Sequence, residues 1–349
     1  MKKRNHLSEP SKSLYEWYSF FDDRGVEREL IEEYVSYINP LLKKGVPIIF
    51  EIQHLSSLIG ISLIELQKMI YSPSSFYRQF NIPKRNGGFR TITTPYPSLK
   101  KCQKWIYKNI LQKQAVDIHA HGYVQSRSIF SNAISHVDKS NLIKIDIENF
   151  FPSLKINWVI NFFKRLGYAH NVSFYLASLC CLNNSLPQGA VTSPYLSNLL
   201  VLTMDKEISK LAEMHGLNYS RYADDIFLSG AEISLDIYSQ VKEIISHHGF
   251  KINLKKTRLL TEDKRKIVTG IAVHNNNMTL PRSKKKDLMN IIYHIKKYGY
   301  ISHISKMKIK NPYYIDSLIG KFNFWKQIEP SNEFVRECLR YLNTIKNQY

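Results

Sequence analysis

The four residues Tyr222-Ala223-Asp224-Asp225 place two acidic side chains next to each other between two segments of mixed polarity. Both flanks, 217–221 and 226–230, are β-prone and lack a helical stripe, so the sequence predicts a strand, a tight turn and a second strand. Adjacent carboxylates at such a turn repel each other and add nothing to a core. They become useful where divalent cations lie between them and a substrate phosphate, although Asp is also common in ordinary turns.

Composition helps to decide whether the two aspartates bind metal ions or only form a turn. The chain has 349 residues, 44% of them hydrophobic, which is enough for a sizeable core divided over two or three subdomains. Its formal net charge is +20, and the segment Lys251–Lys310 holds 16 Lys and Arg against 3 Asp and Glu. A face that only keeps a protein soluble normally mixes both signs, so this concentration predicts a nucleic-acid-binding surface.

The cysteines and the apolar runs indicate the compartment. Cys102, Cys180, Cys181 and Cys338 form no C-x-x-C pair, which disfavours a zinc site and favours buried thiols in a reducing cytoplasm. The basic start Met1–His6 is not followed by an apolar segment, so it does not predict a secretory signal. No uninterrupted apolar run reaches the roughly 18 residues of a membrane span, and we expect no membrane partner.

Helical spacing dominates the N-terminal region, 1–74, which is either a cap or an oligomer surface. A hairpin is then predicted around Asn86-Gly87-Gly88, with Lys84, Arg85 and Arg90 beside the turn. These cations either grip a triphosphate or a template backbone, or are incidental charges on an exposed hairpin. A helix is predicted to follow over 99–111.

Two further segments carry candidate functional side chains. The strand predicted over 141–147 carries Asp146 near its C-terminal end, where an acid that faces a cleft is a candidate metal ligand. A short helix is predicted to begin near Ser128, and Asn132 and His136 share one face of it at i, i+4 spacing. On spacing alone these two side chains either contact nucleic acid or pair with each other, and the structural role is favoured.

The rest of the chain is predicted as alternating turns, helices and strands. Pro187-Gln188-Gly189 is a turn that opens one long helix through Met204, and the glycine allows close backbone approach. The further expectations are a helix over 235–247, a basic strand over 251–258, one strand over 267–273, a hairpin at 275–277 and a mainly helical stretch over 283–349.

The order of these motifs resembles the fingers and palm of reverse transcriptases over about residues 75–275. The matching pieces are the Lys84–Arg90 hairpin, the Asp146 strand with Phe150-Phe151-Pro152-Ser153, the Pro187-Gln188-Gly189 turn and Tyr222-Ala223-Asp224-Asp225. Asn132-Ala133-Ile134-Ser135-His136 and Val268-Thr269-Gly270 are similar to the N-A-x-x-H and V-T-G signatures of retron reverse transcriptases. The resemblance implies an α+β right-hand polymerase fold, divided into an N-terminal helical extension (1–74), fingers and palm (75–274) and a helical, basic, RNA-binding thumb (275–349).

The resemblance also implies the roles of individual residues. Asp146, Asp224 and Asp225 would be catalytic and, with the Ile147 carbonyl, would hold two Mg²⁺ ions. The residues implied for binding the incoming deoxynucleoside triphosphate are Lys84, Arg90, Phe151, Gln188 and Gly189. Phe151 would exclude a 2′-hydroxyl, and Lys255 or Lys256 is a candidate to protonate the leaving pyrophosphate. The residues implied for RNA binding are Asn132, His136, Val268, Thr269, Gly270, Lys284, Lys285 and Lys286.

The implied function is RNA-directed DNA synthesis by a bacterial retron enzyme in the cytoplasm. One structured non-coding RNA would serve as primer and template, and the DNA would stay joined to it through a 2′–5′ branch. The implied biology is anti-phage defence with a separate effector protein, and an oligomer of the chain is a further expectation. The alternatives are another defence-associated or diversity-generating reverse transcriptase, a non-catalytic RNA-binding scaffold, or a two-metal nuclease. The nuclease has no use for a sugar-selecting aromatic residue.

Overall fold

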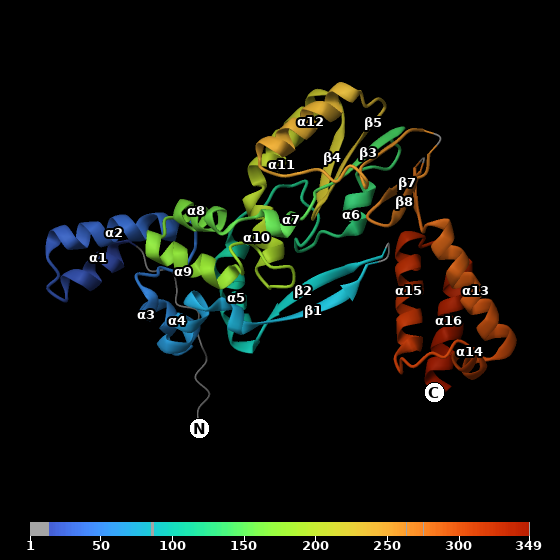
Figure 1. Ribbon diagram of the computed structural model, residues 1–349, viewed down its shortest axis with the longest axis horizontal. Coiled ribbons are helices and arrows are strands. Elements are labelled where there is room, and N and C mark those ends of the chain that lie inside the picture. The colour runs from blue at the N-terminus through green and yellow to red at the C-terminus, as the bar shows by residue number, and fades with distance from the viewer. Residues whose placement is uncertain (1–13, 85–86, 263, 275, 349) are drawn as a thin grey trace. The chain divides into compact units, whose positions relative to one another are not determined.

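The computed structural model describes residues 14–84, 87–262, 264–274 and 276–348 of the protein. The chain forms two compact units, each assembled from separate stretches (Figure 1). The first contains the chain up to Ile118 together with Glu148–Lys206 and Ser246–Lys251. The second contains His119–Ile147, Glu207–Ile245 and the chain from Ile252 onward. The predicted division into three consecutive parts, 1–74, 75–274 and 275–349, stays a prediction.

Helices make up most of the first unit, as the apolar spacing predicts. Its elements are α1 (Leu14–Asp22), α2 (Arg28–Lys43), α3 (Ile52–Ile59), α4 (Leu63–Tyr71), η1 (Pro73–Phe76), β1 (Tyr77–Pro83), β2 (Phe89–Pro95), α5 (Pro97–Asn109), η2 (Leu111–Lys113), α7 (Phe150–Ser153), α8 (Ile156–Leu166), α9 (His170–Cys180) and α10 (Ser193–Leu200). The basic start of the sequence lies outside the described residues.

The predicted charged hairpin is present as β1 and β2. The two strands pair antiparallel from Tyr77↔Pro95 to Pro83↔Phe89, and the side chains near the tip are exposed. At the tip the Lys84 N–H donates to the Gly88 carbonyl at 2.9 Å, while Arg85 and Asn86 lie outside the described residues. The hairpin therefore presents Lys84 and Arg90 to solvent.

The second unit is built on a four-stranded antiparallel sheet in the order β4-β5-β3-β6. Its strands are β3 (Asn141–Asp146), β4 (Asn218–Tyr222), β5 (Asp225–Gly230) and β6 (Arg258–Leu260), and α6 spans Ile129–Ile134. Two helices, α11 (Leu202–Met214) and α12 (Leu235–His247), have residues in both units. The strand before Asp146 and the hairpin at Tyr222–Asp225 are thus confirmed.

A second sheet and four helices complete this unit. The sheet has the order β7-β8-β9, with strands Lys266–Val268, Ile271–His274 and Asn277–Thr279, and the helices are α13 (Arg282–Tyr298), α14 (Tyr300–Lys306), α15 (Tyr314–Ile328) and α16 (Glu333–Gln348). Side chains from both sheets, α6 and these helices form one continuous apolar cluster that includes Val268, Ile271 and Trp325. The predicted α+β class and helical C-terminal stretch are confirmed. Among the helices of the described residues, none is both long and apolar enough to cross a bilayer.

Three local predictions are wrong. The strand expected over 267–273 is a hairpin, because Thr269 and Gly270 adopt positive φ angles of 45° and 86° and reverse the chain. The basic strand expected over 251–258 is mostly irregular, and pairing with β3 begins only at Arg258. The single long helix expected through Met204 is two helices that Val201 separates, with φ −98° and ψ 10°.

Gly189 allows two backbone segments of the first unit to approach closely. Its φ is 122°, and a Cβ atom there would lie 2.8 Å from the Thr93 carbonyl oxygen. The Thr93 N–H donates to the neighbouring Gln188 carbonyl at 2.8 Å, which joins this turn to β2. Only glycine fits both this backbone conformation and this separation.

We predict that Gly189→Ala destabilises the protein more than Gly216→Ala does. Gly216 also has a positive φ, 63°, but nothing lies within 4 Å of its added Cβ. Both variants should pay a conformational penalty of about 1 kcal/mol, and only the first adds a clash with backbone. Melting temperatures measured side by side check this, and equal losses would contradict the steric explanation.

Candidate active site

The two-residue turn between β4 and β5 carries one of the candidate acids under backbone strain. Tyr222 pairs with Asp225, so only Ala223 and Asp224 form the loop. Ala223 has a φ of 58°, in the left-handed region that residues with a Cβ rarely adopt. Such strain costs on the order of 1–3 kcal/mol and persists only where surrounding structure enforces it.

Three neighbouring groups hold this turn. The Ile147 N–H donates to the Asp224 carbonyl at 2.9 Å, and the fully buried Arg221 donates from Nη1 to the Ala223 carbonyl at 3.1 Å. Gly122 lies so close that a Cβ on it would be 2.8 Å from the Ala223 nitrogen. Arg221 and Gly122 were not predicted as functional residues, because nothing in their local sequence pattern shows that they contact the turn.

Strand register brings the candidate acids together. Asp225 lies on the central strand β5, with Tyr222 opposite on β4 and Asp146 opposite on β3. Burial is the largest cause that raises the pKa of Asp224, and the neighbouring charges of Asp225 and Asp146 raise it further. Burial also raises the pKa of Asp225, although Lys144 opposes the effect. The structure thus gathers carboxylates that repel each other, an arrangement that favours a bound cation.

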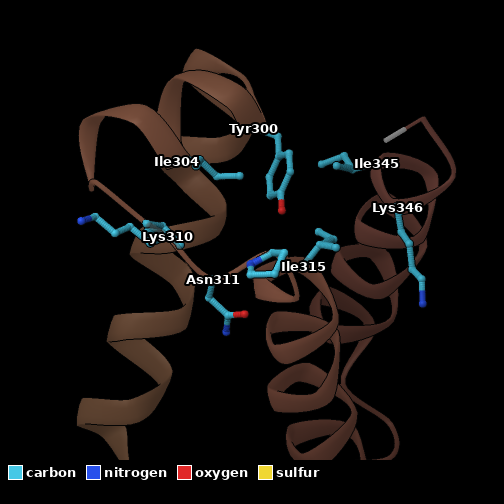
Figure 2. Close-up of a pocket in the computed structure, with 9 residues that line it drawn as sticks. Tyr300, Ile304, Lys310, Asn311, Ile315, Ile345 and Lys346 are labelled. Atoms are coloured by element: carbon cyan, nitrogen blue, oxygen red, sulfur yellow. The ribbon is translucent and has the colours of Figure 1, made fainter.

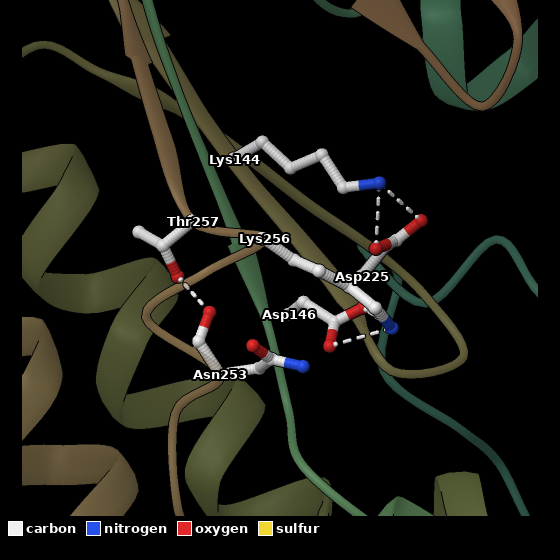
Figure 3. A network of polar contacts seen from close by, with 6 residues as sticks. All are labelled: Lys144, Asp146, Asp225, Asn253, Lys256 and Thr257. Atoms are coloured by element: carbon white, nitrogen blue, oxygen red, sulfur yellow. Dashed lines mark hydrogen bonds and ion pairs between the residues drawn. The ribbon is translucent and has the colours of Figure 1, made fainter. Parts of the chain in front are cut away.

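Two lysines form ion pairs with Asp225 and Asp146, as Figure 3 shows. The Lys144 ammonium lies 2.8 Å from both oxygens of Asp225, and the Lys256 ammonium lies 3.0 and 3.1 Å from those of Asp146. Lys256 was a candidate from sequence, whereas Lys144 was missed. Lys144 and Asp146 are two residues apart on β3 and therefore share a face of the sheet, which is the signal that identifies Lys144.

The donor set suits a hard divalent cation. Carboxylate and carbonyl oxygens are the ligands that such cations prefer, and the sequence predicts Asp146, Asp224, Asp225 and the Ile147 carbonyl for this role. The two ammonium groups stand in as cations on two of these carboxylates. The residues present therefore fit the metal that the resemblance implies.

The residues predicted to bind the incoming nucleotide lie in the first unit. Lys84 and Arg90 are exposed on the β1–β2 hairpin, and Gln188 and Gly189 form the turn that approaches β2. Phe151, in α7, is half-buried, with its ring edge-on to Phe150 at 5.5 Å between centroids. Their assignment as nucleotide contacts stays a prediction.

The two polar residues of the N-A-x-x-H segment are interior, which corrects their assignment to RNA. Asn132 and His136 are at most 1% exposed, so neither side chain offers a surface to a nucleic acid. They do not pair with each other. His136 lies between Ser229 and Ser220, at 2.7 Å from Nδ1 and 2.6 Å from Nε2, whereas the amide of Asn132 has no hydrogen-bond partner in the described part of the chain.

The V-T-G segment is partly interior as well. Val268 is fully buried in the apolar cluster, so its side chain does not contact RNA. The Thr269 hydroxyl donates to the Ile129 carbonyl at 3.2 Å. Gly270 lies next to Lys284, whose ammonium would be 3.4 Å from an added Cβ. Contacts of RNA with the half-buried Thr269 and Gly270 stay predictions.

The three consecutive lysines at the start of α13 have different environments. Lys285 pairs with Glu329 at 2.7 Å and lies over the Trp325 ring at 5.8 Å. Burial alone would raise the pKa of Glu329, but hydrogen bonds from Lys285 and the Leu280 N–H hold it below its usual value. Lys285 is therefore paired within the protein, which favours a structural role over the predicted phosphate contact. Lys286 is exposed and Lys284 half-buried.

The C-terminal helices also carry exposed tyrosine side chains and a pocket. On α13 the Lys297 ammonium lies 5.4 Å from the centroid of the exposed Tyr293 ring and 5.3 Å from that of Tyr298. A pocket of about 270 Å³ opens beside α14, α15 and α16, with apolar side chains on its walls and polar ones at its margin (Figure 2). Its lining includes Tyr300, Ile304, Ile315, Ile345, Lys310, Asn311 and Lys346.

Comparisons with known proteins agree on one family. The profile described as "Reverse transcriptase (RNA-dependent DNA polymerase)" matches residues 82–310. The chain is 34% identical over 265 residues to the retron Ec86 reverse transcriptase of Escherichia coli, covering 74% of this chain and 83% of that protein. It is 31% identical to the retron Mx162 reverse transcriptase of Myxococcus xanthus, covering 66% of this chain and 54% of that one.

Among solved structures, a Candida albicans telomerase in complex with a telomeric RNA fragment aligns at 11% identity with a TM-score of 0.45. The alignment covers 77% of this chain and 63% of that one, and at this level it adds nothing to the assignment. The family profile, with the fold and the acids described above, makes the chain a reverse transcriptase with the right-hand polymerase fold, an RNA-directed DNA polymerase. Within that class it belongs to the retron reverse transcriptases.

The burial of His136 generates a prediction about stability and pH. Burial, followed by the charges of His121 and Lys139, lowers the pKa of His136 from 6.5 to about 3. Because the unfolded chain takes up this proton first, stability is full above about pH 6.5 and falls toward pH 3. Each pH unit in that window should remove roughly 1.4 kcal/mol per such group.

We therefore expect His136→Gln to reduce the loss of stability between pH 7.5 and pH 5.5, as measured by urea unfolding at both values. His121, whose pKa burial lowers to about 4, should leave a residual dependence in the variant. His247→Gln, at an exposed site, is the matched control and should keep the dependence of the wild type. A His136→Gln protein with an unchanged pH dependence would contradict the assignment of His136 as a buried neutral imidazole.

Proposed function

We propose that this retron reverse transcriptase uses one structured non-coding RNA as both primer and template. Its product would be single-stranded DNA joined to that RNA through a 2′–5′ branch. The observation that carries the catalytic part of the proposal is the register that sets Asp146 opposite Asp225, with Asp224 in the adjoining turn.

The reaction joins a hydroxyl oxygen to the α-phosphorus of a deoxynucleoside triphosphate, while the bond to pyrophosphate breaks and the hydroxyl loses its proton. Asp146, Asp224, Asp225 and the Ile147 carbonyl would hold two Mg²⁺ ions. When bound there, such ions stabilise the charge on the attacking and leaving oxygens. Lys256 forms an ion pair with Asp146. Once released from that carboxylate, the Lys256 ammonium would protonate the leaving pyrophosphate.

The first unit supplies the proposed nucleotide contacts. Lys84 and Arg90 would hold the triphosphate, because both cations are exposed on one hairpin. Gln188 and Gly189 would shape the pocket for the templating base. Phe151 would lie beneath the sugar and exclude a 2′-hydroxyl.

The RNA would be held by the basic C-terminal helices. Shape and 2′-hydroxyl contacts recognise folded RNA without long base readout, and exposed rings beside lysines, as at Tyr293 and Lys297, suit unpaired bases. The proposed setting is the bacterial cytoplasm and anti-phage defence, with a separate effector protein and possible self-association.

The decisive experiment is isolation of the nucleic acid that copurifies with the protein. The wild type should carry one RNA species linked to single-stranded DNA, from which a debranching enzyme, but not RNase, releases a free 5′ phosphate. Asp224→Asn and Asp146→Asn should carry the RNA alone, because a bridging charge is lost. The exposed Asp236→Asn is the control and should behave as wild type. Heterogeneous RNAs or DNA with an unlinked 5′ end would contradict the use of one RNA as primer and template, and DNA on Asp224→Asn would overturn the assignment of the catalytic site.

Phe151→Ala should admit ribonucleotides while DNA synthesis continues. Removal of the ring opens space for the 2′-hydroxyl and leaves the acids in place. Primer extension with each of the two nucleotide types measures the discrimination. Phe174→Ala is the control, since Phe174 is also a half-buried aromatic residue of the first unit. If Phe151→Ala discriminates between the two sugars as sharply as the control, Phe151 does not exclude the 2′-hydroxyl.

The lysines of α13 should separate into two classes. Lys284→Gln with Lys286→Gln should weaken RNA binding and reduce the log–log salt dependence by roughly one unit per lost phosphate contact. Lys285→Gln should leave that slope unchanged and lower the melting temperature, because Glu329 loses its partner. The exposed Lys242→Gln, outside the basic segment, is the control for both measurements. A salt dependence that falls only in Lys285→Gln would mean that Lys285 contacts phosphate and that Lys284 and Lys286 do not.

A further inference from the structure

Helix α6 joins the two signature motifs, although they are far apart in sequence. The hydroxyl of Thr269, in the V-T-G turn, donates to the carbonyl of Ile129 in the first turn of α6 at 3.2 Å. Ala133, in the N-A-x-x-H segment, belongs to the same buried apolar cluster as Val268 and Ile271. The two motifs therefore form one interior structure.

The other end of this structure reaches the catalytic hairpin. His136 follows α6 and lies between Ser220 on β4 and Ser229 on β5, at 2.6 and 2.7 Å. Asn218, at the start of β4, donates from its side-chain amide to the Ser135 carbonyl at 2.6 Å. Because β4 and β5 end in the turn that carries Asp224, these contacts fix the strands on which the acid depends.

The same structure is anchored among the C-terminal helices. The hairpin β7–β8, which contains the V-T-G turn, packs in one apolar cluster with Leu288 of α13 and Trp325 of α15. A displacement of these helices would therefore pass to the V-T-G turn, then to α6, and then to β4 and β5. The path consists of packed side chains and hydrogen bonds, all within the second unit.

Backbone strain marks the centre of this path. Thr269 has a φ of 45°, and a β-branched residue in the left-handed region is an outlier. Glycine or asparagine would adopt this conformation more easily. Strain that persists at a defined position points to a role for the side chain, and here the side chain supplies the bond to α6.

We propose that Thr269 and His136 are positioning residues for nucleotide addition. They join the V-T-G turn, α6 and the catalytic hairpin in series, so that the carboxylates reach their reactive arrangement only when the basic helices are in place. This inference rests on the proposed catalytic role of Asp224. It gives the N-A-x-x-H and V-T-G motifs a shared interior role in place of direct contacts of Asn132, His136 and Val268 with RNA.

The test compares three substitutions at one position in the full-length protein. Thr269→Val removes the hydroxyl and keeps the branched side chain, Thr269→Gly removes the hydroxyl and relieves the strain, and Thr269→Ser keeps the hydroxyl. With poly(rA)·oligo(dT) as the probe, one would measure the maximal rate of dTTP incorporation, the KM for dTTP, the Kd for the primer–template and the melting temperature. Thr344→Val is the control, because its hydroxyl also donates to a backbone carbonyl but lies on the exposed face of α16.

Loss of one hydrogen bond that acts on the reactive arrangement should lower the maximal rate about tenfold in Thr269→Val and Thr269→Gly. The KM and the Kd should stay within about twofold of wild type, and Thr269→Ser and Thr344→Val should keep the wild-type rate. A wild-type rate in Thr269→Gly, or a rate loss that follows only the melting temperature, would overturn the proposal. Asp224→Asn in the same assay separates the two claims. Activity in that variant would refute the catalytic role on which the inference rests, whereas an inactive Asp224→Asn beside a wild-type rate in Thr269→Val would refute the positioning path alone.

A second comparison tests whether the links act in series. Ser229→Ala removes one partner of His136, and its effect should not multiply with that of Thr269→Val, because a path broken at one point transmits nothing further. The double variant should therefore have a rate within about twofold of the slower single variant. Rates that multiply would mean that the two contacts act independently, and the proposal of a single path would be wrong.

Discussion

The antiparallel pairing of β3 with β5 is the constraint on which the candidate active site depends. It sets Asp146 opposite Asp225, and Tyr222 on the other side of β5 closes the turn that carries Asp224. Because side chains alternate along a strand, a slip of one residue would turn an acid to the other face of the sheet. The buried neighbours that fix this register therefore serve the chemistry as well as the stability of the unit.

Repulsion between the carboxylates is balanced locally by Lys144 and Lys256. Each ammonium lies within about 3 Å of one carboxylate, so Asp225 and Asp146 are paired, while the pKa of Asp224 is raised by burial and by these neighbouring acids. A divalent cation offers the same compensation with more charge and with oxygen ligands in place of an ion pair. The carboxylates of Asp146 and Asp225 can therefore pair either with the two lysines or with the proposed cations.

Strained or crowded backbone recurs along one route through the second unit. Thr269 and Ala223 both have positive φ angles, and Gly122 leaves no room for a Cβ beside the catalytic turn. The hydrogen bond that the Thr269 hydroxyl donates to Ile129 in α6, and the bond that Arg221 donates to the Ala223 carbonyl, hold these conformations. Asn132, His136 and Val268 of the two signature motifs thus lie in the interior of the second unit, whereas Tyr293 and Tyr298 of α13 are exposed.

Local sequence determined much of this protein. Turn chemistry and alternation identified the Asp224 hairpin and the Asp146 strand, helical periodicity identified the helices, and charge identified the basic segment, because each signal depends on neighbours in the chain. The sequence did not reveal that Lys144 neutralises Asp225, that Lys285 is committed to Glu329, or that Gly122 and Arg221 support the turn. The family resemblance also implied RNA contacts for His136 and Val268, whereas both side chains are buried. Apart from the bond of Arg221 to Ala223, which joins close neighbours in the chain, these outcomes depend on contacts between residues from 44 to more than 90 positions apart. Only the tertiary structure decides which side chains such contacts bury.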